Sequence, residues 1–117
     1  MKRILIADDS FYQRIILSRL VEELGHKSDG VGSGEELLER IDSSYDCIFL
    51  DLLMTGMSGI EVLEILKDQE NVPPIIVITA DVQKSRKKEC LELGAVAFIQ
   101  KMITKQELQE TLNEIFS

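Results

Sequence analysis

The 117-residue sequence has few of the residues that crosslink or rigidify a chain: two cysteines, two prolines, one histidine and no tryptophan. Cys47 and Cys90 form no CxxC pair, so the sequence predicts buried free thiols rather than a disulfide or a zinc site. No apolar run approaches the roughly 18 residues of a membrane span, and the apolar stretch that follows residue 3 is too brief for a signal peptide. We therefore expect no membrane association and, by default, a cytoplasmic protein.

Basic residues are also in the minority. Thirteen Lys and Arg stand against 21 Asp and Glu, which gives a formal net charge of -8 at pH 7. Most of such a surface repels a phosphate backbone, so we expect no direct nucleic-acid partner. The hydrophobic fraction of 44% is ordinary for a folded globular protein, and the length suffices for one hydrophobic core but not for two. We predict a single domain over residues 1–117.

Short apolar runs alternate with helical patterns along the whole chain. Strand character is found in residues 3–7 (RILIA), 47–50 (CIFL), 75–79 (IIVIT) and 95–99 (AVAFI). These runs are continuous rather than alternating, which is typical of strands covered on both faces. Residues 26–33 (HKSDGVGS) predict at most a short edge strand.

The segments between the strands carry helical periodicity. In the first, the apolar residues Tyr12, Ile15, Ile16, Leu20 and Leu24 are predicted to share a face, with Ser10 as the N-cap and Gly25 just past the end. Further helices are predicted over residues 34–42, 59–69, 82–93 and 105–116. Strands that alternate with helices imply right-handed crossovers and a doubly wound α/β domain with a parallel sheet.

Polar side chains follow every well-predicted strand. Asp8 and Asp9 follow the first, Asp51 follows residues 47–50, Thr79 ends residues 75–79 and Lys101 comes shortly after residues 95–99. In a parallel sheet these positions converge on one rim, where doubly wound folds bind their ligands. Three carboxylates on one rim suit a hard cation such as Mg²⁺, which favours phosphoryl chemistry. One aspartate then serves as nucleophile, helped by the Thr79 hydroxyl and the Lys101 charge, although this reasoning does not decide which aspartate.

Four motifs resemble one known family. The segments LIADDS, IFLDLLMTGMSGIEVL, IIVITAD and GAVAFIQKMI together closely resemble the receiver domain of two-component response regulators. In length the chain is similar to a stand-alone, chemotaxis-type receiver, and the resemblance covers essentially all 117 residues. It implies a flavodoxin-like (βα)5 fold with a five-stranded parallel sheet in the order 2-1-3-4-5.

The resemblance also implies a role for each residue at the rim. Asp51 is expected to be the phospho-acceptor. Asp9 and Asp51 are expected to bind Mg²⁺ directly through their side chains, and Leu53 through its backbone carbonyl. Asp8 is expected to act through a metal-bound water.

Further roles concern the switch and the partners. Thr79 is expected to be the hydroxyl that moves toward the phosphoryl group, Phe98 the aromatic side chain whose packing follows, and Lys101 the cation beside the phosphate. Residues 82–116 are expected to form the face that a downstream target protein reads. The only histidine, His26, is expected to be a surface residue far from this site, so the phosphoryl group should come from a histidine kinase or phosphotransfer protein.

The sequence departs from the family where Thr55 and Met102 replace usual prolines. Because a cis bond before a non-proline residue costs roughly 3 to 4 kcal/mol, we predict a trans Lys101–Met102 bond. Leu53 stands where fast-decaying members often have a polar side chain, so we hypothesise a long-lived phosphoryl group; Asp81 acts in the opposite direction if it orients water.

Three other interpretations stay open. A receiver-like module could bind its partner whether or not Asp51 is modified. A Mg²⁺-dependent phosphohydrolase needs a second acid or base and a substrate cap, for which DLLM and 117 residues offer no room. A flavin binder of the same fold would place phosphate where Asp8 and Asp9 repel it. The basic segment 84–88 (KSRKK) reads either as a solvated helix face or as a surface that steers an acidic partner.

Overall fold

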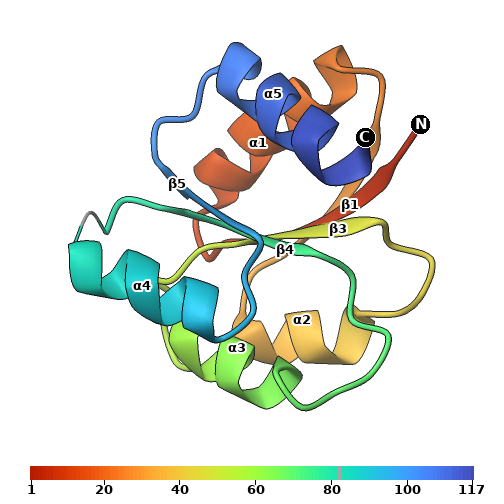
Figure 1. Cartoon of the computed structure of the whole chain (residues 1–117). Helices are drawn as coiled ribbons and strands as arrows, with labels where there is room; N and C mark the ends of the chain where they lie inside the picture. Colours follow the sequence, from red (N-terminus) through yellow and green to blue (C-terminus); the bar gives the residue numbers. More distant parts are fainter. Residues whose placement is uncertain (82) are drawn as a thin grey trace.

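The computed structural model describes residues 1–81 and 83–117, in which strands and helices alternate from one end to the other (Figure 1). The strands are β1 (Arg3–Ala7), β2 (Lys27–Val31), β3 (Cys47–Leu50), β4 (Ile75–Thr79) and β5 (Ala97–Gln100). The helices are α1 (Phe11–Glu23), α2 (Gly34–Arg40), α3 (Gly59–Leu66), α4 (Lys84–Glu92) and α5 (Lys105–Phe116). Residue 82, the first of a predicted helix, lies outside the described residues.

The five strands form one parallel sheet in the order β2-β1-β3-β4-β5, which confirms the predicted doubly wound fold. The register pairs Ile4 with Cys47, Ile48 with Ile75 and Thr79 with Gln100. Helices α1 and α5 cover one face of the sheet, and α2, α3 and α4 cover the other (Figure 1). The carboxyl ends of all strands therefore lie along the same rim.

Two hydrophobic clusters, one on each face, hold the layers together. Alternate residues of the central strands divide between them, so that Leu5, Ile48 and Val77 face one cluster and Ile4, Phe49 and Ile76 face the other. All six are at most 1% exposed. Because period-2 alternation points successive side chains to opposite faces, only a continuous apolar run can fill both clusters.

The short edge strand that residues 26–33 predict is present as β2. Residues Lys27–Val31 pair with β1 along their length, at the edge of the sheet. Four of the five residues are exposed or only partly buried, which explains why the segment KSDGV carries so little hydrophobic signal.

The predicted helix caps are present, but several element boundaries differ from the prediction by one to three residues. Ser10 accepts a hydrogen bond from the Gln13 N–H, and Gly25 takes a positive φ of 86° after α1. Helices α2 and α3 end at residues 40 and 66, earlier than predicted, and β5 begins at residue 97 rather than 95. The last shift arises because the Ala95 N–H bonds to the Cys90 carbonyl and so completes the end of α4.

The predicted buried face of α1 was partly wrong. Leu17 and Val21 are the buried residues of this helix, whereas Tyr12 is 69% exposed. Five residues separate Tyr12 from Leu17, which is about 1.4 helical turns, so the two side chains point in different directions. The apolar character of Tyr12 therefore gave a misleading periodicity.

The Lys101–Met102 peptide bond is cis, so the predicted trans bond was wrong. The prediction used only the preference of an isolated peptide bond. In the folded chain, Lys101 is held by a backbone bond to the Thr79 carbonyl and Ile103 is buried in the core, while Met102 between them is 62% exposed. Tertiary contacts on both sides of this bond fix its geometry.

Both cysteines are free and buried, as predicted. Within residues 1–81 and 83–117, no helix is long and apolar enough to cross a bilayer.

Candidate functional site

Three carboxylates from distant parts of the sequence lie together at the carboxyl ends of the strands. Asp8 and Asp9 follow β1, and Asp51 follows β3. One carboxylate oxygen from each lies within 4.8 Å of the other two. The parallel order places β1 beside β3, which brings these loops into contact although 42 positions separate Asp9 from Asp51.

Lys101 reaches into this cluster from the end of β5. Its Nζ donates to Asp8 Oδ2 at 2.6 Å and to Asp51 Oδ2 at 3.0 Å. The lysine side chain is 12% exposed, so the pairs are shielded from water. Burial lowers the pKa of Lys101, but the bonds to Asp8 and Asp51 outweigh it and leave the pKa raised. Lys101 is therefore a fixed positive charge between two carboxylates.

Asp51 is a buried carboxylate whose charged form is disfavoured by its burial. It is 6% exposed, and this burial raises its pKa, although the Lys101 bond and the Leu53 N–H oppose the shift. The Leu53 N–H donates to Asp51 Oδ1 at 3.2 Å. The Leu53 side chain points away from the core and is 56% exposed. Asp51 therefore presents a desolvated carboxylate at the base of the cluster.

The two aspartates after β1 differ in their surroundings. Asp8 is 1% exposed and accepts the Ser10 N–H at 2.9 Å through Oδ1. Asp9 is exposed, and its Oδ2 accepts both the N–H and the hydroxyl of Thr55 at 2.9 and 3.0 Å. Asp8 is thus rigidly bound within the protein, whereas Asp9 stands at the solvent side.

The donor set fits a hard divalent cation. Three carboxylates face one ammonium group, so the cluster keeps an excess of negative charge when its aspartates are ionised. All the available ligand atoms are oxygens, and Asp9 leaves one side open to water. Mg²⁺ prefers this combination of few carboxylates and retained waters. The residues present therefore fit Mg²⁺.

Thr79 lies at the end of β4, between the strands that carry Asp51 and Lys101. Its side chain is fully buried, and its Oγ1 accepts the Asp81 N–H at 3.2 Å. Asp81 in turn accepts the Gln83 N–H at 3.1 Å and lies 3.4 Å from the Arg86 guanidinium of α4. A chain of contacts thus joins the Thr79 hydroxyl to α4.

Phe98 pairs with Val77 in the β4–β5 register. It is partly buried and packs against the cluster beneath α2, α3 and α4. Its ring is therefore neither locked in the core nor free in solvent.

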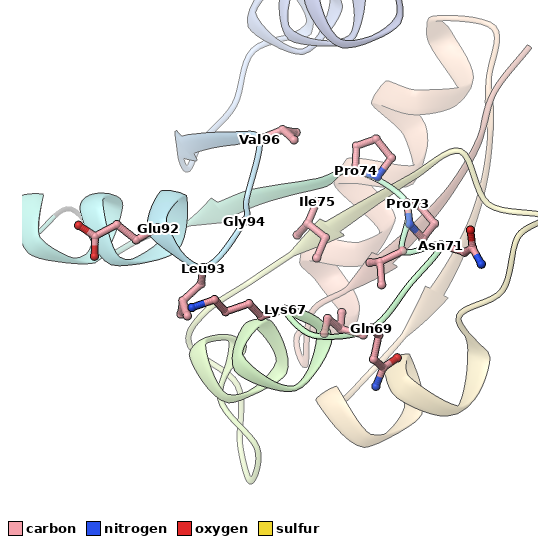
Figure 2. Close-up of a pocket in the computed structure, with 12 residues that line it drawn as sticks. Lys67, Gln69, Asn71, Pro73, Pro74, Ile75, Glu92, Leu93, Gly94 and Val96 are labelled. Carbon is pink, nitrogen blue, oxygen red and sulfur yellow. The ribbon is translucent and has the colours of Figure 1, made fainter.

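A hollow of about 570 Å³ lies far from this chemistry. It is formed where α3 and α4 end and β4 begins, and it is lined by residues that include Lys67, Pro74, Glu92 and Val96 (Figure 2). None of the three aspartates lines it. Because the hollow lies at the amino end of β4, it is at the opposite edge of the sheet from the carboxylate cluster. The cluster is therefore an open rim and not part of this cavity.

Comparison with known proteins agrees with the geometry. The response regulator receiver domain family matches residues 4–113. The chain belongs to this family. A two-component response regulator of Arabidopsis thaliana, number 24, is 32% identical over 113 residues, which cover 95% of this chain and 81% of that protein.

Other relatives contain a receiver within a longer chain. The sensory/regulatory protein RpfC of Xanthomonas campestris is 34% identical over 118 residues, which cover 97% of this chain but only 16% of RpfC.

Among solved structures, the response regulator TrrA of Thermotoga maritima, in complex with Mg(2+)-BeF, is 31% identical with a TM-score of 0.86, covering 98% of this chain and 99% of that one. The chemotaxis protein CheY4 of Vibrio cholerae is 25% identical with a TM-score of 0.88, covering 98% of both chains.

The receiver also contains site contacts that the sequence does not reveal. In the sequence Thr55 stands out only as a missing proline, yet it holds Asp9. Arg14 does not stand out at all, yet its Nη1 donates to the backbone carbonyl of Asp8 at 2.6 Å. Neither pattern has a sequence signal of its own, because both contacts depend on how two loops and a helix meet.

Proposed function

We propose that this receiver is switched by phosphorylation of Asp51, with residues 1–117 acting as one domain. The observation that carries the proposal is the position of Asp51, a buried carboxylate bonded to Lys101 and within 4.8 Å of two further carboxylates. Family membership supports the same role, since phosphorylation-dependent switching is what response regulator receivers do.

In the proposed reaction an Asp51 carboxylate oxygen attacks the phosphorus of a phosphohistidine. An O–P bond forms, the N–P bond breaks, and the imidazole of the donor leaves. Lys101 supplies positive charge next to the attacked group. The Thr79 hydroxyl can donate its proton to a phosphoryl oxygen, because its Oγ1 acts only as the acceptor in the bond from the Asp81 N–H. The only histidine of the chain, His26, is bonded to Lys2 before β1 rather than to the rim, so the donor is a histidine kinase or a phosphotransfer protein.

Asp9 and Asp51 would hold Mg²⁺ through their side chains, with the Leu53 carbonyl as a further ligand and Asp8 acting through a bound water. When bound, the ion neutralises the carboxylates and the incoming phosphoryl oxygens. Asp9 is the aspartate whose carboxylate is exposed, which supports its direct role.

The signal would pass from Thr79 to α4. Movement of the Thr79 hydroxyl releases the Asp81 N–H, and Asp81 is tied to α4 through Arg86. Phe98 is half-buried beside β4 and follows this shift. The face read by a downstream protein comprises α4, β5 and α5. The output is therefore a change in binding, and the only reaction catalysed is the receiver's own phosphorylation and dephosphorylation.

Incubation with Mg²⁺ and acetyl phosphate, followed by intact-mass measurement, tests the acceptor. The parent protein should gain one phosphoryl group and Asp51→Asn should gain none. Asp68→Asn, an exposed aspartate in the α3–β4 connection, is the matched control and should behave like the parent. A parent protein that stays unmodified contradicts the proposal and favours a receiver-like module that phosphate does not switch.

A further inference from the structure

Arg14 lies on α1, outside the carboxylate cluster, but its guanidinium is bonded to the cluster's backbone. Its Nη1 donates to the carbonyl oxygen of Asp8 at 2.6 Å. This carbonyl belongs to the peptide bond that joins Asp8 to Asp9. The Asp8 N–H donates on the other side to the Val31 carbonyl at 3.1 Å. The backbone of Asp8 is therefore held at both ends, once by β2 and once by Arg14.

The Arg14 side chain has no ion-pair partner within 4.0 Å among residues 1–81 and 83–117. Its polar contact in this region is the Asp8 carbonyl, and its Cζ lies 5.5 Å from the centre of the Phe11 ring. A charged donor gives a carbonyl one of the stronger hydrogen bonds that proteins form. Arg14 thus uses its charge on a backbone atom rather than on a carboxylate.

Two glycines leave the space that this side chain occupies. A Cβ at Gly30 would lie 3.2 Å from Arg14 Cδ, and a Cβ at Gly32 would lie 3.3 Å from Arg14 Nη1. Positive φ angles occur at Gly25, Gly56 and Gly94 but not at these two positions, so their backbone conformation does not require glycine. A side chain at either position would instead reduce the space that Arg14 occupies.

We propose that Arg14 is a positioning residue for the cation site. It fixes the Asp8–Asp9 peptide, and through it the placement of the exposed Asp9 carboxylate. This inference rests on the proposed Mg²⁺ site and adds to it a residue that touches no ligand. Groups that orient metal ligands typically change metal affinity by about tenfold or more when removed.

The experiment measures Mg²⁺ binding to the intact protein by titration calorimetry, together with the Mg²⁺ dependence of phosphorylation by acetyl phosphate. Arg14→Met should raise the Mg²⁺ dissociation constant by about tenfold. The rate at saturating Mg²⁺ should change much less, because the reacting groups of Asp51 and Lys101 are untouched. Arg19→Met, an exposed arginine on the same helix, is the matched control and should leave both quantities unchanged.

Gly32→Ala provides a second test in case Arg14→Met folds poorly. The added methyl group crowds Arg14 Nη1 and should weaken Mg²⁺ binding several-fold, whereas the double variant should bind no more weakly than Arg14→Met alone. Additive losses in the double variant, or unchanged Mg²⁺ affinity in both single variants, overturn the role of Arg14. A parent protein that binds no Mg²⁺ contradicts the proposed function and this inference together. A parent protein that binds Mg²⁺ while both single variants keep its affinity contradicts this inference alone, so the two failures are distinguishable.

Discussion

Replacing Asp51 with asparagine should stabilise the protein in the absence of Mg²⁺, by about 1 kcal/mol. The change removes one negative charge and keeps the shape of the side chain. The amide oxygen of the new side chain can still accept the Leu53 N–H, and Lys101 keeps its partner Asp8.

The magnitude follows from the distances in the cluster. At an effective dielectric constant of about 20, charges on Asp51 and Asp8 within 4.8 Å repel by at least about 3.5 kcal/mol, while Lys101 at 3.0 Å attracts Asp51 by about 5.5 kcal/mol. Asp9 adds to the repulsion. With Asp9 also within 4.8 Å, the repulsion reaches about 7 kcal/mol or more and exceeds the attraction. The cost of burying the Asp51 carboxylate, which also raises its pKa, acts in the same direction.

Urea unfolding at about pH 7.5 in the presence of a chelator measures this difference, since free energies of unfolding extrapolate linearly. Asp68→Asn, on the surface, should lie within about 0.5 kcal/mol of the parent. Added Mg²⁺ should stabilise the parent more than Asp51→Asn and so reduce or reverse the gap. An Asp51→Asn protein that is less stable than the parent without Mg²⁺ would mean that the Lys101 pair outweighs burial, and would refute this reasoning.

Of three further predictions, two concern residues near the site, and one concerns a residue distant from it. Leu53→Asn should speed loss of the phosphoryl group, measured as the decay of the phosphorylated mass, because an exposed apolar side chain is replaced by one that can orient water; an unchanged decay rate contradicts the long-lifetime hypothesis. Arg86→Gln should raise the rate of phosphorylation by acetyl phosphate about twofold. The half-exposed ion pair between Arg86 and Asp81 holds Asp81 in the position where its N–H binds the Thr79 hydroxyl, and the substitution removes this pair. A slower rate would show that the ion pair favours the reactive state. Burial lowers the pKa of His26, whose Nδ1 accepts the Lys2 N–H, so the stability that neutral His26 contributes is present above pH 6.5 and is lost as the pH falls through the lowered pKa. The free energy of unfolding should therefore drop less between about pH 7.5 and about pH 5 in His26→Asn than in the parent protein. An equal drop in both proteins excludes this effect.

The sequence predicted the sheet well because its strands are buried on both faces. Runs such as IIVIT admit few other interpretations, and their alternation with helices left one class of fold. Prediction was weaker where burial is partial. The edge strand Lys27–Val31 is polar, and Tyr12 is an apolar residue on the solvent side of its helix. Both cases depend on which neighbours cover a surface, which local periodicity does not record.

The carboxylates and Lys101 were accessible to sequence reasoning because the carboxyl ends of parallel strands share one rim. The contacts that hold them were not. Thr55 binds Asp9 and Arg14 binds the Asp8 backbone, and each contact joins elements whose spacing is set by tertiary packing. The cis bond at Lys101–Met102 was missed for the same reason, since the prediction considered the peptide bond without the fold around it.

The central claim is that modification of Asp51 changes the α4, β5 and α5 face. Backbone amide NMR of the uniformly labelled protein, recorded with Mg²⁺ before and after acetyl phosphate is added, tests it most directly. The account predicts shifts near Asp51, Thr79 and Lys101 that extend through α4 and β5 into α5, and no such change in Asp51→Asn. Shifts confined to the rim, with α4 and α5 unmoved, would contradict the account and identify a receiver that accepts phosphate without transmitting a signal.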